Sequence, residues 1–128
     1  DFVNGVHTRW LFHGSTAVDS IVSDDISGFK PLMSSAALWG RGIYFARDAQ
    51  YPDDHRIVRI DDRGVREVLL CLVVTGMAVL GDPSYRMPPQ RRQTSHRYNS
   101  YVDSLSDPEI FVVHEAVSAI PNYVVRYM

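Results

Sequence analysis

The chain has 128 residues, of which 45% are apolar, and a formal net charge of −2 at neutral pH. This length fits one domain with a real hydrophobic core. The net charge argues against a surface built for general binding of polyanions, and no segment reaches the ~18 apolar residues of a transmembrane helix. The single cysteine, Cys71, lies in an apolar run and cannot form an internal disulfide, which fits a reducing compartment.

A first strand is predicted over residues 10–13, Trp-Leu-Phe-His, and Gly14 follows it. Two apolar residues, a titratable ring and a glycine are typical of a strand end that delivers a side chain into a cleft. The residues that come next predict a short helix over 15–22, with Ser15 or Thr16 as the N-cap.

A second strand is predicted over residues 43–46, Ile-Tyr-Phe-Ala, after a loop over residues 30–42. Gly40 and Gly42 end this loop, and glycine permits positive φ or the close approach of another backbone or a ligand. Tyr44 combines an aromatic face with a polar tip, so it can stack on a flat ring and still form a hydrogen bond.

Residues 48–58 predict no clear element, because Pro52 interrupts the start of a helical pattern. A continuous apolar run predicts a strand over residues 66–75 that is covered on both faces. Gly76 ends or bulges this strand, and residues 77–80 continue it.

Residues 81–106 predict a long polar loop, which in a compact domain is usually functional or mobile. The default interpretation of its basic side chains is a solvated loop. The alternative is a role near the acceptor, in contact with an acidic protein or a nucleic acid. These side chains are Arg86, Arg91, Arg92, His96 and Arg97. Two late strands are predicted over residues 110–114 and 123–127, and we interpret them as a hairpin.

Three of these segments together resemble the signature blocks of the poly(ADP-ribose) polymerase-like, or diphtheria-toxin-like, ADP-ribosyltransferases. They are Leu-Phe-His-Gly-Ser at 11–15, Gly-Arg-Gly-Ile-Tyr-Phe-Ala at 40–46 and Pro-Glu-Ile-Phe-Val-Val at 108–113. The first two are specific only as a pair, and the third is a plain apolar strand without them. The resemblance covers the chain from residue 10 to its end and implies an α+β fold of two small, mainly antiparallel sheets around an NAD cleft, with few short helices.

The resemblance also implies one ADP-ribosyltransferase-like catalytic domain over residues 1–128. Family members carry a further helix and strand before the first block, so the domain is expected to be minimal or truncated at its N-terminus. The chain starts with Asp1 and is expected to be part of a longer protein.

The activity implied by the resemblance is mono-ADP-ribosyl transfer from NAD+ to a protein acceptor, or to a nucleic acid, with release of nicotinamide. NAD+ is then a substrate, and no redox cofactor is expected; the chain also lacks the Gly-x-Gly-x-x-Gly pattern of a Rossmann site. The five histidines show no zinc-type spacing, so no metal is expected. No membrane partner is expected, and the expected location is the cytoplasm or nucleus, with a secreted effector left open.

The resemblance assigns catalytic roles to His13, Tyr44 and Ile110. His13 holds the adenosine-side ribose, Tyr44 stacks on the nicotinamide ring, and Ile110 stands where polymerising members carry glutamate. Strand side chains alternate between faces, so Glu109 points away from the cleft if Ile110 points into it. A shift of one residue in the alignment would reverse the two.

The residues assigned to NAD binding lie in the first two blocks and just after the second: His13, Gly14, Ser15, Tyr44, Phe45, Ala46 and Tyr51. Gly14 presents its backbone to the nicotinamide amide, because the ring must come close. Two family positions depart from the pattern: a serine position falls near Pro52, and a second stacking tyrosine falls near His55 or Ile57. Tyr51 is the candidate substitute, and the departures predict weaker NAD binding.

Each of the three catalytic candidates also has a plain structural interpretation, as a core-edge histidine, a core tyrosine or a core isoleucine. The main functional alternative is a weak or inactive pseudoenzyme that binds NAD, ADP-ribose or a protein partner. NAD glycohydrolase and tRNA 2′-phosphotransferase activities are further alternatives.

Overall fold

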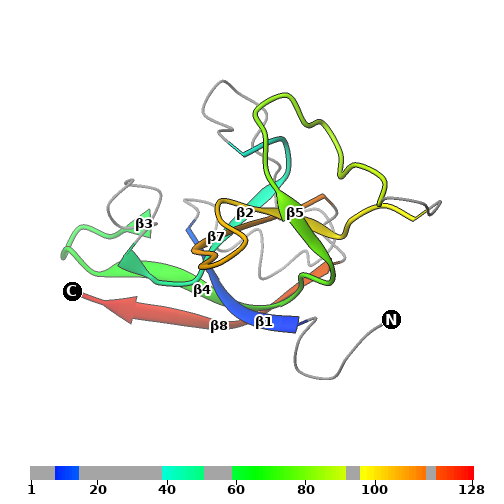
Figure 1. Cartoon of the computed structure of the whole chain (residues 1–128). Helices are drawn as coiled ribbons and strands as arrows, with labels where there is room; N and C mark the ends of the chain where they lie inside the picture. Colours follow the sequence, from blue (N-terminus) through cyan, green and yellow to red (C-terminus); the bar gives the residue numbers. More distant parts are fainter. Residues whose placement is uncertain (1–7, 15–38, 51–58, 92–95, 115–117) are drawn as a thin grey trace.

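The computed structural model describes residues 8–14, 39–50, 59–91, 96–114 and 118–128 (Figure 1). In chain order, these residues form eight strands: β1 (Thr8–His13), β2 (Ile43–Ala46), β3 (Arg59–Ile60), β4 (Arg66–Val74), β5 (Ala78–Leu80), β6 (Ser100–Val102), β7 (Ile110–Val113) and β8 (Ala119–Tyr127). No helix in this part of the chain is long and apolar enough to cross a membrane. The helix predicted over residues 15–22 lies outside the described residues, as do most of the loop at 30–42 and most of 48–58.

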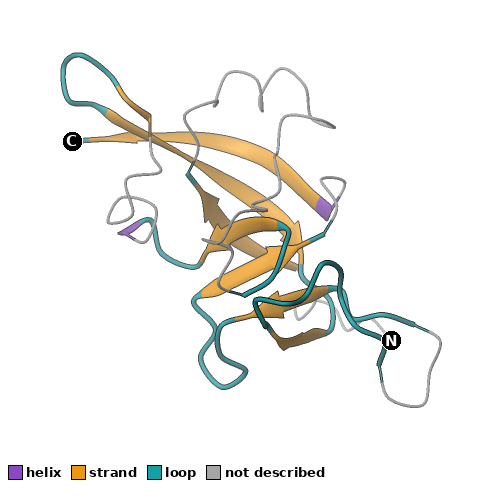
Figure 2. Cartoon of the chain, turned by 90° about the horizontal axis from the view of Figure 1, so that it is seen from above, coloured by secondary structure: helices purple, strands orange, loops and turns teal. Residues whose placement is uncertain are grey.

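The strands follow the hydrogen-bonded order β3-β4-β1-β2-β7-β6-β5, and β8 also pairs with β4. Every pairing is antiparallel except that of β5 with β6. Figure 2 shows the long strands β4 and β8 side by side, with the shorter strands grouped beside them. The mainly antiparallel, helix-poor fold is confirmed. The two small sheets that were expected are instead one continuous sheet, because β1 and β2 pair at one residue pair, Phe12 with Ala46.

Four strand predictions are confirmed by β1, β2, β4 and β7. The expectation that β4 is covered on both faces is wrong in part. Leu69, Cys71 and Val73 are buried, whereas Leu70 and Leu72 are half-buried. The reason is that β4 lies between the antiparallel strands β1 and β8, so its side chains alternate between the core and an outer face.

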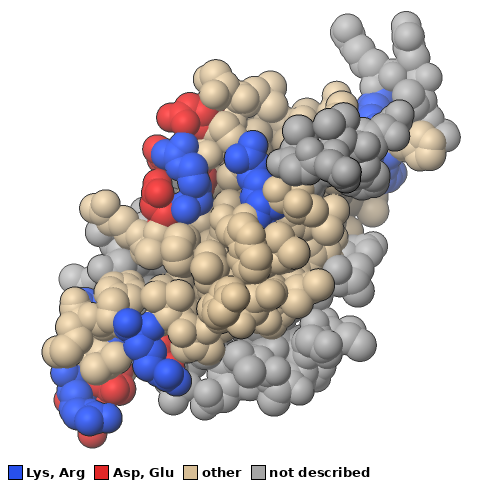
Figure 3. Space-filling model, turned by 90° about the horizontal axis from the view of Figure 1, so that it is seen from below, with Lys and Arg blue, Asp and Glu red and all other residues tan. Residues whose placement is uncertain are grey.

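The outer face of β1, β4 and β8 carries exposed apolar side chains. Trp10, Leu72 and Ile120 are aligned across the three strands, and the Tyr123 ring lies 6.0 Å from the Trp10 ring, between centroids. Figure 3 shows the molecule from below, where the charged side chains gather mainly near the margins. The described core therefore lies on the opposite face of these strands, with Leu11 and Cys71.

The prediction of one long polar loop over residues 81–106 is wrong, because β6 lies within it and is buried. The polar groups of this strand are satisfied by distant backbone. Ser100 Oγ donates to the Thr75 carbonyl at 2.8 Å, and Tyr101 Oη donates to the Arg41 carbonyl at 2.8 Å. These partners are far away in the sequence, so the three-residue strand has no local signal.

The predicted hairpin of the last two strands is also wrong. β7 lies between β2 and β6, whereas β8 pairs with β4. β8 begins earlier than predicted, at Ala119, and contains a bulge: Pro121 lies opposite Cys71 and Tyr123 opposite Leu70, so Asn122 is the extra residue. A bulge accommodates Pro121, which has no N–H to donate to a ladder.

Candidate functional site

His13 ends β1 and is bonded directly to the second signature block. Its Nδ1 donates to the Tyr44 carbonyl at 2.7 Å, because a carbonyl oxygen can only accept. The imidazole is only 9% exposed, and its ring centroid lies 5.1 Å from that of Phe45. Burial lowers the pKa of His13 below its usual 6.5, and the hydrogen bond to Tyr44 offsets part of this effect. His13 is therefore a neutral imidazole at neutral pH, with its proton on Nδ1.

Tyr44 is half-buried, and its hydroxyl is held in the turn that precedes β2. The hydroxyl accepts the Trp39 N–H at 3.0 Å and donates to the Gly40 carbonyl at 2.6 Å. Two hydrogen bonds to one turn fix the orientation of the ring. The tyrosine is thus a preorganised aromatic wall whose polar tip is already engaged.

The pairing of β2 with β7 puts the second and third signature blocks on one face. Tyr44 lies opposite Val112 and Ala46 opposite Ile110, and paired residues share a face. These side chains form one apolar cluster. Phe45 lies in the cluster on the other face of β2, and it is Phe45 that contacts the His13 ring. His13 and Tyr44 are therefore joined through the Tyr44 backbone, and a cleft shared by their side chains stays a prediction.

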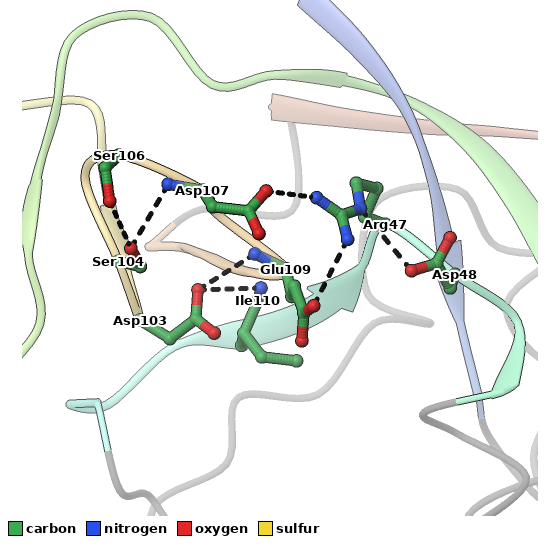
Figure 4. Close-up of polar contacts among 8 residues, drawn as sticks. All are labelled: Arg47, Asp48, Asp103, Ser104, Ser106, Asp107, Glu109 and Ile110. Carbon is green, nitrogen blue, oxygen red and sulfur yellow. Dashed lines mark hydrogen bonds and ion pairs between the residues drawn. The ribbon is translucent and has the colours of Figure 1, made fainter.

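The structure places Ile110 on the Tyr44 face and Glu109 outside. Ile110 is 3% exposed, whereas the Glu109 side chain is 57% exposed. The Glu109 carboxylate accepts from Arg47 Nη2 at 3.2 Å (Figure 4). Of the two orientations that the sequence left open, this is the one in which the third signature position is apolar.

A polar corner that the sequence did not reveal holds the start of β7. Asp103 Oδ1 accepts the backbone N–H groups of Glu109 and Ile110, each at 3.0 Å. The Arg47 guanidinium also pairs with Asp107 at 2.7 Å, and this hydrogen bond is the main cause that raises the pKa of Arg47. Sequence reasoning missed the corner because Arg47 meets these acids only through the β2–β7 pairing.

Comparison with known proteins finds homologues of the chain, although no protein-family model matches it. The chain is 36% identical over 125 residues to human protein mono-ADP-ribosyltransferase PARP12, which covers 95% of this chain and 17% of PARP12. It is 29% identical over 133 residues to human protein mono-ADP-ribosyltransferase PARP14, which covers 99% of this chain and 7% of PARP14. The chain is a homologue of the PARP family.

The fold of this PARP homologue agrees with its sequence relationship. The crystal structure of the PARP domain of Arabidopsis RADICAL-INDUCED CELL DEATH1 is similar, with a TM-score of 0.71 and 21% sequence identity. The match covers 93% of this chain and 66% of that one. The chain thus spans about two-thirds of this neighbour and a small part of the curated relatives.

Only some of the other predicted NAD-binding residues of the PARP homologue lie within the described part of the chain. Gly14 is half-buried directly after His13, and Ala46 is buried beside Ile110. Ser15 and Tyr51 lie outside the described residues, as do the departures at Pro52, His55 and Ile57. The direct binding roles of Phe45 and Ala46 stay predictions.

The remaining chemistry-bearing residues lie away from this site. Arg97 Nη1 donates to the Pro88 carbonyl at 2.7 Å, which braces the basic loop. A cavity of about 260 Å³ opens at the other end of β7, beside Arg97 and His114, and none of the described NAD-binding candidates lines it. Cys71 is fully buried, as predicted, and burial raises the pKa of its thiol to about 12. Among the described residues, no group of His, Cys, Asp and Glu side chains is arranged to hold a metal ion.

Proposed function

We propose that this PARP homologue transfers single ADP-ribose units from NAD+ to a protein acceptor and releases nicotinamide. The observation that carries the proposal is the 36% identity to a mono-ADP-ribosyltransferase across 95% of the chain. Further support comes from the way the three signature blocks meet at β2, through the His13–Tyr44 hydrogen bond and the β2–β7 pairing. An intracellular location is part of the proposal, since Cys71 is unpaired and NAD+ is required.

The proposed reaction breaks the bond between the nicotinamide ring nitrogen and the ribose C1′. The bonding pair goes to the ring nitrogen, so nicotinamide leaves as a neutral molecule and needs no proton. An acceptor carboxylate oxygen then forms the new bond to C1′, which has oxocarbenium character. The tasks left to the protein are to position both reactants and to exclude water.

The described side chains suit these tasks. In its neutral form with the proton on Nδ1, the Nε2 atom of His13 is an acceptor, and a ribose hydroxyl is able to donate to an acceptor of this kind. Tyr44 offers an aromatic face that its own hydroxyl fixes in place. Gly14 directly follows His13 and has no side chain to keep a flat ring from its backbone.

Ile110 decides the class of acceptor under this proposal. It carries no atom that could accept a proton from a hydroxyl nucleophile, and the Glu109 carboxylate lies outside, in an ion pair with Arg47. Among the described residues, neither Ile110 nor Glu109 can serve as a general base on this face, which favours an acceptor that is nucleophilic without one, as an Asp or Glu carboxylate is at neutral pH. The acidic protein side chain is thus favoured over the nucleic-acid alternative.

The test follows labelled NAD+ into protein, nucleic acid and free ADP-ribose, together with nicotinamide release. We expect label on protein from the wild-type chain, little from His13→Ala, and none from Tyr44→Ala. Tyr123→Ala is the matched control, because Tyr123 is an exposed tyrosine on β8 away from β2. Label found only as free ADP-ribose would favour the glycohydrolase. NAD+ binding without nicotinamide release would favour the pseudoenzyme. That alternative is based on the departures from the family pattern near Pro52.

A further inference from the structure

The Asp103 side chain closes a hydrogen-bonded corner at the start of β7. Its Oδ1 accepts two consecutive backbone N–H groups, those of Glu109 and Ile110. The Asp103 N–H in turn donates to the Ile110 carbonyl at 3.3 Å, and the Arg47 N–H donates to the Glu109 carbonyl at 2.8 Å. All four backbone polar groups of residues 109 and 110 therefore have partners at this corner. Figure 4 shows the two bonds to the Asp103 carboxylate.

Asp103 contributes more to this corner than the ion pairs of Arg47 do. The Arg47 guanidinium and the Asp107 and Glu109 carboxylates are solvent-exposed, and exposed ion pairs contribute little to stability. Hydrogen bonds from backbone N–H groups to a carboxylate are charge-assisted and stronger, and the one from Ile110 is partly buried. Of the two polar supports of residues 109 and 110, Asp103 is thus the stronger, and it acts together with the β2–β7 pairing.

The Ile110 side chain, whose backbone N–H bonds to Asp103, lies in a buried, apolar part of the Tyr44 face. Ile110, Ala46 and Val112 are each buried and pack together, with Tyr44 against them. Close packing of these three apolar side chains leaves no polar group between them that could bind water.

We propose that Asp103 is a positioning residue that holds Ile110 beside Tyr44, where Ile110 is the apolar wall that keeps water away from the ribose C1′ during transfer. This proposal rests on the proposed function. If the wall moves, water replaces the acceptor: a water oxygen forms the bond to C1′, its proton goes to solvent, and the product is free ADP-ribose. Asp103 thereby sets the ratio of hydrolysis to transfer.

The experiment measures the ratio of free ADP-ribose to protein-bound label for three variants of the full chain. We expect Asp103→Ala to raise this ratio about tenfold, because both backbone N–H groups lose their acceptor. Asp103→Asn should restore the ratio, since its amide oxygen accepts the same two bonds. Ser104→Ala is the matched control: Ser104 lies in the same loop and accepts the Asp107 N–H, but it does not contact Ile110.

The ratio separates positioning from a general loss of stability. A variant that is merely less folded makes less of both products, so the ratio stays constant. An unchanged ratio in folded Asp103→Ala therefore overturns the proposal. If Asp103→Ala does not fold, Asp103→Ser, which is too short to reach both N–H groups, and Ile110→Ala, which shortens the wall, replace it. Each must raise the ratio for the proposal to stand.

A failure of the proposed function gives a different result. A wild-type chain that neither transfers nor hydrolyses NAD+ overturns the proposed function and, with it, the role of Ile110 against water. The positioning role of Asp103 is then decided by amide hydrogen exchange. Faster exchange at Glu109 and Ile110 in Asp103→Ala, with Val112 unchanged, supports it, and unchanged exchange at all three overturns it.

Discussion

The buried imidazole of His13 makes the stability of the protein depend on pH. Burial lowers the pKa of His13 in the folded chain below the usual 6.5, so the unfolded chain binds this proton more readily. The contribution of His13 to stability is fully present above about pH 6.5 and is lost as pH falls toward the lowered pKa. We expect the free energy of unfolding to decrease across this window.

Urea unfolding at a series of pH values checks this expectation. His13→Asn should lose this part of the pH dependence, because its side-chain amide can still donate to the Tyr44 carbonyl but does not titrate. His114→Asn is the control, since His114 is exposed at the end of β7. Equal pH dependence in His13→Asn and the wild-type chain would show that His13 is not the titrating group.

The two parts of Tyr44, its ring and its hydroxyl, make separable contributions. Tyr44→Phe keeps the ring but removes the bonds to Trp39 and Gly40, so we expect a loss of about 1 kcal/mol in unfolding free energy and severalfold lower NAD+ turnover. Tyr44→Ala removes the stacking wall and should abolish turnover. Thermal unfolding and nicotinamide release measure the two effects, with Tyr123→Phe as the control. Unchanged turnover in Tyr44→Ala would contradict the stacking role.

Single residues also show where sequence reasoning reached its limit. Strand alternation predicts that Ile110 and Glu109 point to opposite sides, but it does not say which one faces Tyr44. That choice depends on the pairing of Ala46 with Ile110 and on the bonds from Asp103, contacts between segments that are distant in sequence or joined by a loop. The predicted site residues that the structure describes lie on β2 or on the strands next to it. The sequence did not predict that Asp103 and Arg47 bind residues 109 and 110.

At the scale of elements, apolar runs bounded by glycine and histidine were sufficient to predict β1, β2 and β4. β6 could not be predicted, because it is three residues long and its buried Ser100 and Tyr101 depend on bonds to distant carbonyls. The partners of β7 and β8 could not be predicted either, since neighbouring strands in a sequence need not pair. Local patterns therefore predicted strands, and only tertiary contacts determined their order in the sheet.

The contact of β2 with β7 depends on the absence of a side chain at Gly42. A Cβ there would lie 2.6 Å from Val112 Cγ1 and 2.7 Å from the Val113 carbonyl oxygen, and φ is +156°. We expect Gly42→Ala to cost roughly 1–3 kcal/mol through overpacking, in addition to backbone strain, and to reduce transfer. Urea unfolding and NAD+ turnover measure these losses.

Gly64→Ala is the matched control for this element. Gly64 has a positive φ of +81° in the turn between β3 and β4, but a Cβ there would meet no atom within 4 Å. Gly64→Ala should lose only the roughly 1–2 kcal/mol of unfolding free energy that backbone strain costs, and its turnover should be unchanged. Equal losses of stability and turnover in the two variants would show that the β2–β7 contact does not require the glycine.

At the scale of the whole molecule, β2 is the strand through which the two ladders of the sheet and the three signature blocks meet. β1 reaches it through one residue pair and the His13 bond, and β7 pairs along its whole length. The face that combines Tyr44 with Ile110 therefore forms only when β2 and β7 pair in the folded sheet. The side chains on this face determine how many ADP-ribose units the protein can add to an acceptor site.

We expect transfer to stop at one ADP-ribose per acceptor site. Growth of a polymer requires a sugar hydroxyl to attack, and a hydroxyl is a poor nucleophile at neutral pH unless a carboxylate polarises it. Ile110 has no acceptor atom, and Glu109, the nearest carboxylate in sequence, is bonded to Arg47 on the outside. An acceptor carboxylate, by contrast, is already anionic and needs no base.

Product analysis after incubation with NAD+ checks this expectation. Discrete single additions, released by neutral hydroxylamine as esters of Asp and Glu, are the expected result. Arg47→Ala is the accompanying variant: it frees Glu109 from its ion pair but leaves the bonds from Asp103 that keep Ile110 inward, so its products should also be single additions. A ladder of ADP-ribose polymer from the wild-type chain would contradict the assignment of Ile110 and indicate Glu109 as the cleft residue. A ladder from Arg47→Ala alone would show that the ion pair, and not Asp103, keeps Glu109 outside.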